Sequence, residues 1–514
     1  MSVVAQAHWE SLLDTVDAAA LCGHVTEGQR SRRLRFGDRV LCPFLRPFFL
    51  DAGDEARVRQ VAETLWVLGE RVAQVAIDSP DMLRQLALSD AEIRLARIDP
   101  GYATTSTAAR ADAFILPESL QFAEYNGESP AGAAYSQGLA ELFDAEPLMA
   151  RFRERFDARF YRPVEALLEA LVASYREWGG TASPPLMAIV DWREVPTFSE
   201  FEILRDTFTA LGVPTIICDP RDLEYVGPAK AGHYVPGDVA VPGDVAVPGD
   251  VAVLQDVASG PSGNVASGGS RGNVVSGSRE NVVSGFSRTS PGLYAQGRRI
   301  DLVYRRVLIN DIVAREAECR ALVDAYEQRA VCVANSLRCK IPHKKAFFAV
   351  LTDARHAALF SAEERELIRR HIPWTAVVEE RSVSRDGTAT DLIGLLRTAR
   401  DRFVIKPNDE YGGTGVTLGW ETSESDWEAA IARALAERDR GWVAQERIAV
   451  RREGFPVCES GAPRGARTRD MLVDFAPYIF RGRLAGFLTR LSATGLANVT
   501  SGGGQVPAFV VSPK

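Results

Sequence analysis

The sequence lacks the features of several common protein classes. No apolar run approaches the ~20 residues that a membrane-spanning helix needs. The first twenty residues carry Glu10, Asp14 and Asp17, where a signal peptide would be basic and then apolar. Positive charge is not in excess either, since 60 Lys and Arg face 68 Asp and Glu for a net charge of -8. We therefore expect a cytoplasmic protein with no membrane partner and no nucleic-acid partner, because binding nucleic acid requires a basic face.

Metal and redox motifs are also missing. The seven cysteines are odd in number and scattered, none is spaced C-x-x-C, and the six histidines form no pair at metal-binding spacing. This pattern indicates reduced thiols rather than a disulfide framework or a zinc site. Neither a G-x-x-x-x-G-K-[ST] loop nor a G-x-G-x-x-G fingerprint occurs, which excludes the two commonest phosphate-binding motifs.

The length and composition indicate a multidomain globular protein. With 514 residues, of which 46% are hydrophobic, the chain is too long for one core. We expect three regions: a largely helical region over 1–180, an α/β region over 181–340 and a region with a glycine-rich loop over 341–514. The repeats of VPGDVA and the Gly- and Ser-rich stretch that follows predict a disordered, functionally silent insertion over 235–291.

Hydrophobic patterns predict the elements of the first two regions. Val61, Leu65, Leu68 and Val72 recur at helical spacing, and further helices are expected over 161–178, 201–211 and 311–328. Apolar runs at 186–190, 215–218 and 300–304 predict buried strands. Strands that alternate with helices in this way favour a parallel sheet.

The stretch 401–420, DRFVIKPNDEYGGTGVTLGW, is the first candidate for function. The apolar run 403–405 predicts a strand that ends at Lys406, before a loop with Gly412, Gly413 and Gly415. Glycines allow positive φ angles, so successive N–H groups can converge on an anion, and the lysine adds positive charge. A polyphosphate would fit, although on its own the stretch favours a hairpin turn beside a solvated lysine.

A second candidate lies at 110–130, RADAFILPESLQFAEYNGESP. Arg110 and Asp112 precede an apolar run, and Glu124 and Asn126 occupy alternate positions of a predicted strand, so they share one face. Carboxylate and amide oxygens suit magnesium that is held partly by phosphates. The alternative is a polar strand edge that ends in an Asn-Gly turn.

Other stretches extend these candidates. Lys344 and Lys345 open an apolar helical stretch. Because the start of a helix is unfavourable for cations, two lysines there suggest an anionic partner. The alternative is a first turn whose lysines are solvated. Residues 442–448 predict a strand in which Gln445 and Glu446 could pass along an adenine edge. Ser425 and Glu428 predict a capping box, and 471–480 with 483–491 predict a hairpin of long strands.

These stretches together resemble the circularly permuted ATP-grasp proteins, which include the synthetase domain of glutathionylspermidine synthetase. The likeness rests on R-x-D at Arg110, EYN at 124–126, Lys345, VIKP with YGGTGV over 404–416, VAQE at 443–446 and the closing LTR…N…GGG. The EYN motif precedes the glycine loop, which is the permuted order. The resemblance implies an α+β, circularly permuted ATP-grasp fold with a small Rossmann-like α/β (pre-ATP-grasp) domain and a helical N-terminal region.

The resemblance also implies a reaction: the γ-phosphate of ATP passes to a carboxylate, and an amine then attacks the acyl phosphate. The partners would be small-molecule or peptide carboxylates and amines, with ATP and Mg²⁺ as cofactors. The implied roles are magnesium binding by Asp112, Glu124 and Asn126, phosphate binding by Lys345 and Lys406, closure over the γ-phosphate by Gly412, Gly413 and Gly415, adenine or ribose contact by Gln445 and Glu446, and stabilisation of the transferring phosphoryl group by Arg110.

Two departures leave the substrates open. EYNGESP replaces the EYN-A-D-T-P of the synthetase, and no Cys/His amidase domain precedes the region, so the likeness is greater to bacterial type 2 permuted proteins. The alternatives to a ligase are an ATP-binding scaffold or regulatory protein without turnover, and a small-molecule kinase. The intact acid-Asn pair and both lysines argue against the scaffold.

Overall fold

The computed structural model describes residues 3–228, 291–385, 387–410, 412–458, 467–494 and 503–514. The described residues within 1–227 and 291–514 form one compact unit with mixed helix and sheet. The expected insertion at 235–291 falls almost entirely on residues outside the described ranges. No helix in the described part of the chain combines the length and the apolar character that crossing a membrane requires.

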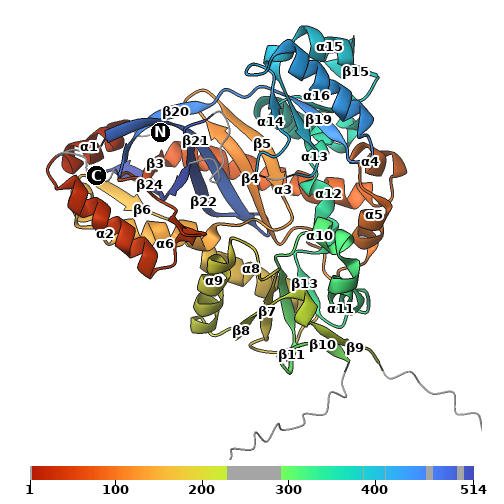
Figure 1. Cartoon of the computed structure of the whole chain (residues 1–514), viewed down its shortest axis with the longest axis horizontal. Helices are drawn as coiled ribbons and strands as arrows, with labels where there is room; N and C mark the ends of the chain where they lie inside the picture. Colours follow the sequence, from red (N-terminus) through yellow and green to blue (C-terminus); the bar gives the residue numbers. More distant parts are fainter. Residues whose placement is uncertain (1–2, 229–290, 386, 411, 459–466, 495–502) are drawn as a thin grey trace, which may run out of the picture. The chain divides into compact units, whose positions relative to one another are not determined.

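The largest sheet has the order β23-β22-β21-β4-β5, with β20 paired to the first half of β21 (Figure 1). Its strands are β4 (Ala108–Ile115), β5 (Leu120–Asn126), β20 (Arg451–Val457), β21 (Arg467–Phe480), β22 (Arg483–Ser492) and β23 (Gly504–Val506). The predicted hairpin of long strands is confirmed as β21 and β22, which turn at Arg481 and Gly482 with φ angles of 44° and 77°.

One face of this sheet forms the main hydrophobic core. Ala109, Ala111 and Ala113 of β4 are buried in the same core cluster as the apolar side of α3 (Ala52–Ala76). The periodic residues of α3 that the sequence singled out are all buried there: Val61, Leu65, Leu68 and Val72. Because side chains alternate along a strand, the residues between the three alanines project from the opposite face.

A four-stranded parallel sheet has the order β13-β12-β7-β8, which confirms the predicted parallel pairing. Its strands are β7 (Met187–Val190), β8 (Thr215–Cys218), β12 (Leu302–Arg305) and β13 (Cys332–Ala334), and the neighbouring helices are α8 (Pro163–Glu177), α9 (Phe198–Ala210), α10 (Ile309–Ala314) and α11 (Glu316–Glu327). The single long helix predicted over 311–328 is wrong, since the backbone leaves helical geometry at Arg315. A small antiparallel sheet of β9 (Glu224–Val226), β10 (Gly292–Ala295) and β11 (Arg298–Ile300) adjoins it.

The third main sheet has the order β14-β19-β17-β18. It contains β14 (Thr375–Val377), β17 (Phe403–Pro407), β18 (Thr417–Leu418) and β19 (Trp442–Glu446), with α15 (Leu392–Thr398) and α16 (Glu424–Ala436) packed on one face. The predicted capping box is wrong: Ser423, not Ser425, caps α16 and accepts a hydrogen bond from the backbone N–H of Asp426. The pattern Ser423-x-x-Asp426 overlaps Ser425-x-x-Glu428, and residue types alone do not distinguish the two.

The other elements surround these sheets. The helices are α1 (Val3–Leu13), α2 (Ala18–Ser31), α4 (Pro80–Gln85), α5 (Asp90–Arg97), α6 (Ala133–Asp144), α7 (Pro147–Phe152), α12 (Lys340–His343), α13 (Ala346–Thr352) and α14 (Ala362–His371). The strands are β1 (Arg35–Phe36), β2 (Arg39–Val40), β3 (Phe48–Asp51), β6 (Phe156–Arg159), β15 (Ser382–Arg385), β16 (Thr388–Asp391) and β24 (Ala508–Pro513).

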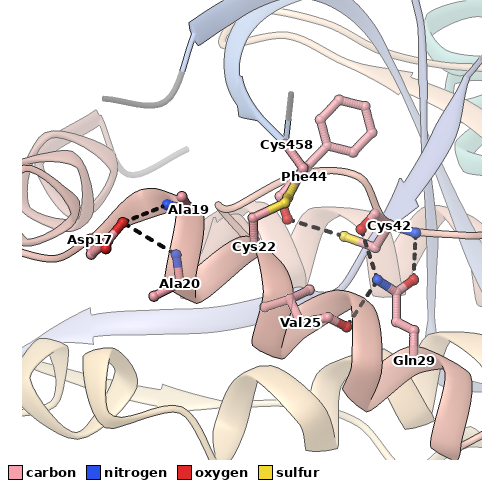
Figure 2. Close-up of a disulfide and its surroundings, with 9 residues drawn as sticks. All are labelled: Asp17, Ala19, Ala20, Cys22, Val25, Gln29, Cys42, Phe44 and Cys458. Atoms are coloured by element: carbon pink, nitrogen blue, oxygen red, sulfur yellow. Dashed lines mark hydrogen bonds between the residues drawn. A yellow bond between two sulfur atoms is a disulfide. The ribbon is translucent and has the colours of Figure 1, made fainter. Parts of the chain in front are cut away.

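A disulfide joins Cys22 of α2 to Cys458 at the end of β20, across 436 positions of sequence (Figure 2). The expectation of reduced thiols is therefore wrong for this pair, whereas the other five cysteines are free and buried. Nearby, Gln29 of α2 binds the backbone of Cys42 through both ends of its amide, at 2.7 and 2.9 Å. Spacing along the chain could not reveal a pair that only the folded arrangement of α2 and β20 brings together.

Candidate functional site

The sheet containing β17 presents one polar face. Phe403 and Ile405 of β17 are buried in the core under α16, so Val404 and Lys406 project from the other side. Val404 pairs in register with Gln445 of β19 and with Leu418 of β18. The strand predicted from the apolar run 403–405 is confirmed, and the alternation of its side chains places Lys406 and Gln445 on a common face.

The glycine-rich loop follows β17 directly. Gly412, Gly413 and Gly415 have φ angles of 67°, 79° and 73°, which L side chains rarely adopt, so the residue type suits the backbone there. A Cβ on Gly415 would lie 2.8 Å from Cγ of Pro407. The sequence-based expectation of a loop with positive φ angles is confirmed.

The largest sheet presents a second polar face. Asp112 of β4 pairs in register with Glu124 of β5, and Arg110 pairs with Asn126. The register shifts between Asp112 and Ala113, so that Ala123 and Glu124 both project toward the polar face. Such β-bulges re-aim side chains next to functional sites.

The two polar faces enclose a cavity of about 220 Å³. Every residue to which the resemblance assigns a role, except Gly415, lines it, namely Arg110, Asp112, Glu124, Asn126, Lys345, Lys406, Gly412, Gly413, Gln445 and Glu446. These residues come from segments that are more than 200 positions apart in the sequence, such as Asn126 and Lys345. A hairpin turn beside a solvated lysine does not account for this convergence.

Lys406 lies inside the cavity rather than in solvent. Its Nζ donates to Oε1 of Gln445 at 2.6 Å and to the carbonyl of Ala123 at 3.4 Å, so it bridges the two sheets. Burial lowers the pKa of Lys406 to about 8, with Glu124 opposing the shift and Lys345 adding to it. An anion that entered the cavity would therefore meet an ammonium group with little competing solvation.

Lys345 and Lys344 lie on opposite sides of their segment. The Nζ of Lys345 lines the cavity, 2.5 Å from the carbonyl of Glu410 and 3.8 Å from Oε1 of Glu124. Lys344 is also buried, but it pairs with Glu92 and Asp409 outside the cavity. The alternative of a solvated first turn is wrong for both lysines, and the anion that Lys344 meets is the protein itself.

Two residues without a proposed role complete the polar face. Arg490 donates to Asp112 and Asp474, each at 2.5 Å, and Arg110 donates to Asp112 at 2.9 Å. Although burial opposes it, these two arginines hold the pKa of Asp112 well below its usual range. Burial raises the pKa of Asp474 to about 7, with Arg490 opposing the shift.

The sequence contains features that could have identified Arg490 and Asp474 as residues of the site. Arg490 is the arginine of the closing LTR motif, and Asp474 is a lone carboxylate in the apolar run 471–480. Apolar residues were missed as well, since Val404, Leu418 and Ile448 line the cavity beside Glu446. Glu446 itself is ion-paired with Arg385 and Arg402.

The residues present fit a nucleotide with magnesium in part. Glu124 and Asn126 offer a carboxylate and an amide oxygen, and the amide nitrogen of Asn126 is turned toward Asp112 at 3.3 Å. Asp112 fits less well as a ligand because two arginines already neutralise it. Among the described residues no three His, Cys, Asp or Glu side chains converge as a metal-binding group. The two oxygen donors of Glu124 and Asn126 suit an ion that takes its other ligands from phosphates and water.

A scan against protein-family models finds no match, and a search of curated proteins finds none either. Among solved structures, the chain is similar to a glutathione synthetase-like effector from Globodera pallida in its apo form. The TM-score is 0.55 at 11% identity, over 96% of this chain and 98% of that chain. A protein provisionally named gamma-glutamylcysteine synthetase, from Methylobacillus flagellatus, matches with a TM-score of 0.37 at 11% identity, over 82% and 84% of the two chains. The first likeness extends over nearly the whole chain and shows a similar fold.

Proposed function

We propose that this chain is an ATP-dependent carboxylate–amine ligase with a circularly permuted ATP-grasp fold. The observation that carries the proposal is the convergence of the EYN strand, Lys345, the glycine loop and β19 on one cavity. The similar fold of a protein named as glutathione synthetase-like agrees with this proposal. The order of the motifs in the chain supports the permuted arrangement.

The cavity has the charges that a bound polyphosphate requires. Lys345 and Lys406 supply two ammonium groups, and the backbone of Gly412 and Gly413 can approach a phosphate closely. Val404, Leu418 and Ile448 offer apolar surface for a base, beside the polar groups of β19. In this proposal Gln445 and Glu446 keep their predicted place near the adenine or ribose.

Arg110 and Arg490 lie on the opposite wall, where they can stabilise a carboxylate substrate and the phosphoryl group that it accepts. Glu124 and Asn126 would hold magnesium, with Asp112 joining them once its arginines turn toward substrate. When bound, the ion supplies positive charge that neutralises the phosphates and orients them.

The chemistry of the residues that line the cavity favours direct transfer of a phosphoryl group from ATP to the carboxylate substrate. Among the described residues that line the cavity there is no Ser, Cys or His, so no serine or cysteine nucleophile with a histidine base is formed there. Phosphoryl transfer to a carboxylate depends on positioning and charge neutralisation, which the arginines and lysines provide. An amine then attacks the acyl phosphate, a C–N bond forms, and inorganic phosphate leaves.

Incubation with ATP, Mg²⁺ and a panel of amino acids tests the proposal, with separate assays for ADP, inorganic phosphate and a mass-shifted product. A ligase yields all three, and the product has the mass of acid plus amine minus water. ADP with a phosphorylated product and no free phosphate would indicate a kinase instead. Nucleotide binding without any turnover across the panel would favour the scaffold alternative.

A further inference from the structure

A cluster of buried ions lies at the base of the glycine-rich loop, outside the cavity. We call Glu92, Lys340, Lys344 and Asp409 the loop-base cluster. Asp409 accepts hydrogen bonds from Nζ of Lys340 at 2.7 Å and from Nζ of Lys344 at 2.6 Å, one on each carboxylate oxygen. Lys344 also donates to both oxygens of Glu92, at 2.8 and 3.0 Å. The side chains of Lys340 and Lys344 are only 0% and 4% exposed.

The residues on either side of Asp409 are bound to the same segment of chain. The carbonyl of Asn408 accepts from the backbone N–H of Lys345 at 3.0 Å, and its side-chain oxygen accepts from the N–H of Ala346 at 2.8 Å. The carbonyl of Glu410 accepts from Nζ of Lys345 at 2.5 Å. Three consecutive loop residues therefore contact segment 340–346, which carries a lysine of the cavity.

The other end of the loop is different. Gly412, Gly413 and Gly415 are exposed and have positive φ angles. The loop thus has a base that is anchored by ion pairs and hydrogen bonds, and an exposed glycine tip. A ligand in the cavity would contact the glycine tip, whereas residues 408–410 are held by their contacts with segment 340–346.

We propose that Asp409 is a positioning residue for nucleotide binding, which fixes the base of the glycine-rich loop against segment 340–346 and so holds Lys345 at the cavity wall. This inference rests on the proposed function of the cavity as a nucleotide site. Asp409 is not among the residues that line the cavity, so it acts through Lys345 and the loop.

Electrostatics explains why a carboxylate is required at this place. Two ammonium groups that are almost fully buried need counter-charges close by, because an unpaired buried charge is strongly unfavourable. If the loop base moved away from segment 340–346, both lysines would lose one partner together. A neutral Asn at position 409 has the same shape, but it can accept from only one lysine and turns an amide N–H₂ toward the other.

Two charge-neutralising variants separate positioning from simple stabilisation. Asp409→Asn and Glu92→Gln each remove one carboxylate from the loop-base cluster, and both remove a partner of Lys344, but Glu92 lies on α5 and not in the loop. Calorimetric titration with a non-hydrolysable ATP analogue and Mg²⁺ should show about tenfold weaker binding for Asp409→Asn and a change within about twofold for Glu92→Gln. Equal weakening in both folded variants, or unchanged affinity in Asp409→Asn, would overturn the proposal.

A double-mutant cycle measures the coupling between Asp409 and Lys345 in nucleotide binding, which a general change in stability does not affect. If Asp409 acts through Lys345, Lys345→Met should weaken nucleotide binding much less in the Asp409→Asn background than in the wild type. Additive effects of the two substitutions would contradict the proposal. Wild-type protein that binds no nucleotide would instead refute the function of the cavity, which distinguishes the two failures.

Hydrogen exchange of the wild type tests the same idea even if Asp409→Asn does not fold. The amides of Lys345 and Ala346, both bonded to Asn408, should exchange slowly without nucleotide, and that of the exposed Gly413 quickly. Exchange at Lys345 and Ala346 as fast as at the glycine tip would show that the loop base is not fixed, and would refute the proposal.

Discussion

Lys406 determines how nucleotide binding should depend on pH. Burial lowers the pKa of its ammonium to about 8, and bound phosphates would raise that pKa again because they favour the charged form. Binding above pH 8 therefore takes up a proton. We expect the affinity for an ATP analogue to fall by up to about tenfold per pH unit above pH 8, as Lys406 loses its proton. Titrations in buffers of different ionisation enthalpy measure this uptake; the same pH dependence in Lys406→Met would exclude Lys406 as its source.

The two carboxylates that face each other across β4 and β5 should respond differently to neutralisation. Asp112→Asn removes the partner of two mostly buried arginines, so the free energy of unfolding without nucleotide should fall by about 3 kcal/mol. Glu124→Gln removes a carboxylate whose nearest cation, Lys345, is 3.8 Å away, so it should leave that free energy nearly unchanged and still abolish turnover.

Denaturant unfolding of the two variants, beside a turnover assay, makes the comparison. Asn126→Ala is the companion variant on β5, and we expect it to lose turnover with little change in unfolding. If Glu124→Gln unfolded as easily as Asp112→Asn, the EYN strand would have a structural role and not a ligand-binding one.

Residue patterns singled out several residues of the cavity where these residues lie on a strand. Alternation along β5 predicted that Glu124 and Asn126 share one face, and the apolar run of β17 predicted that Lys406 ends a strand before the glycine loop. Arg490 and Lys344 show where such reasoning ends. Arg490 reaches the site through strand pairing far along the chain, and one of the two partners of Lys344, Asp409, lies in a loop 65 positions away.

At the scale of elements, the disulfide between α2 and the end of β20 is the feature that no spacing rule could predict. A cross-link over 436 positions restricts the unfolded chain strongly. We expect Cys22→Ser to lower the free energy of unfolding by about 2 to 5 kcal/mol under non-reducing conditions.

Alkylation of denatured, unreduced protein followed by mass spectrometry checks the pairing directly. Five alkylated cysteines are expected before reduction and all seven after it. For the unfolding measurement, Cys42→Ser is the matched control of Cys22→Ser, because Cys42 is a buried cysteine close to the disulfide but is not part of it. Seven reactive thiols before reduction would restore the original expectation of reduced cysteines.

Element boundaries were predicted unevenly for physical reasons. The parallel strands β7, β8 and β12 are short apolar runs, and burial on both faces makes such runs distinct in sequence. The start of α16 depends on which of two nearby serines accepts a hydrogen bond from a backbone N–H. The break between α10 and α11 depends on which residue leaves helical geometry. Such alternatives differ little in local free energy, and tertiary contacts contribute the difference that selects one of them.

At the scale of the whole molecule, the repeats should be dispensable. β9 and β10 pair in register at Val226 and Gly292, so the chain leaves the compact unit and returns to it at neighbouring positions. Deletion of 235–291 leaves 227–234 to close this connection, and a shorter loop lowers the entropic cost of closure. We expect the melting temperature and nucleotide affinity to stay close to those of the wild type. Precipitation of the deleted protein, or loss of nucleotide binding, would show that the repeats support the fold.

The central claim is that the cavity between the two sheets binds ATP, and calorimetric titration with a non-hydrolysable ATP analogue and Mg²⁺ tests it most directly. The wild type should bind one analogue per chain. Lys406→Met keeps the aliphatic stem and removes the charge, so binding should weaken by at least about tenfold, or about 1.4 kcal/mol, with the fold intact. Lys345→Met should behave in the same way. Folded wild type that gives no binding heat, or equal affinity in all three proteins, would contradict the assignment of this cavity to nucleotide.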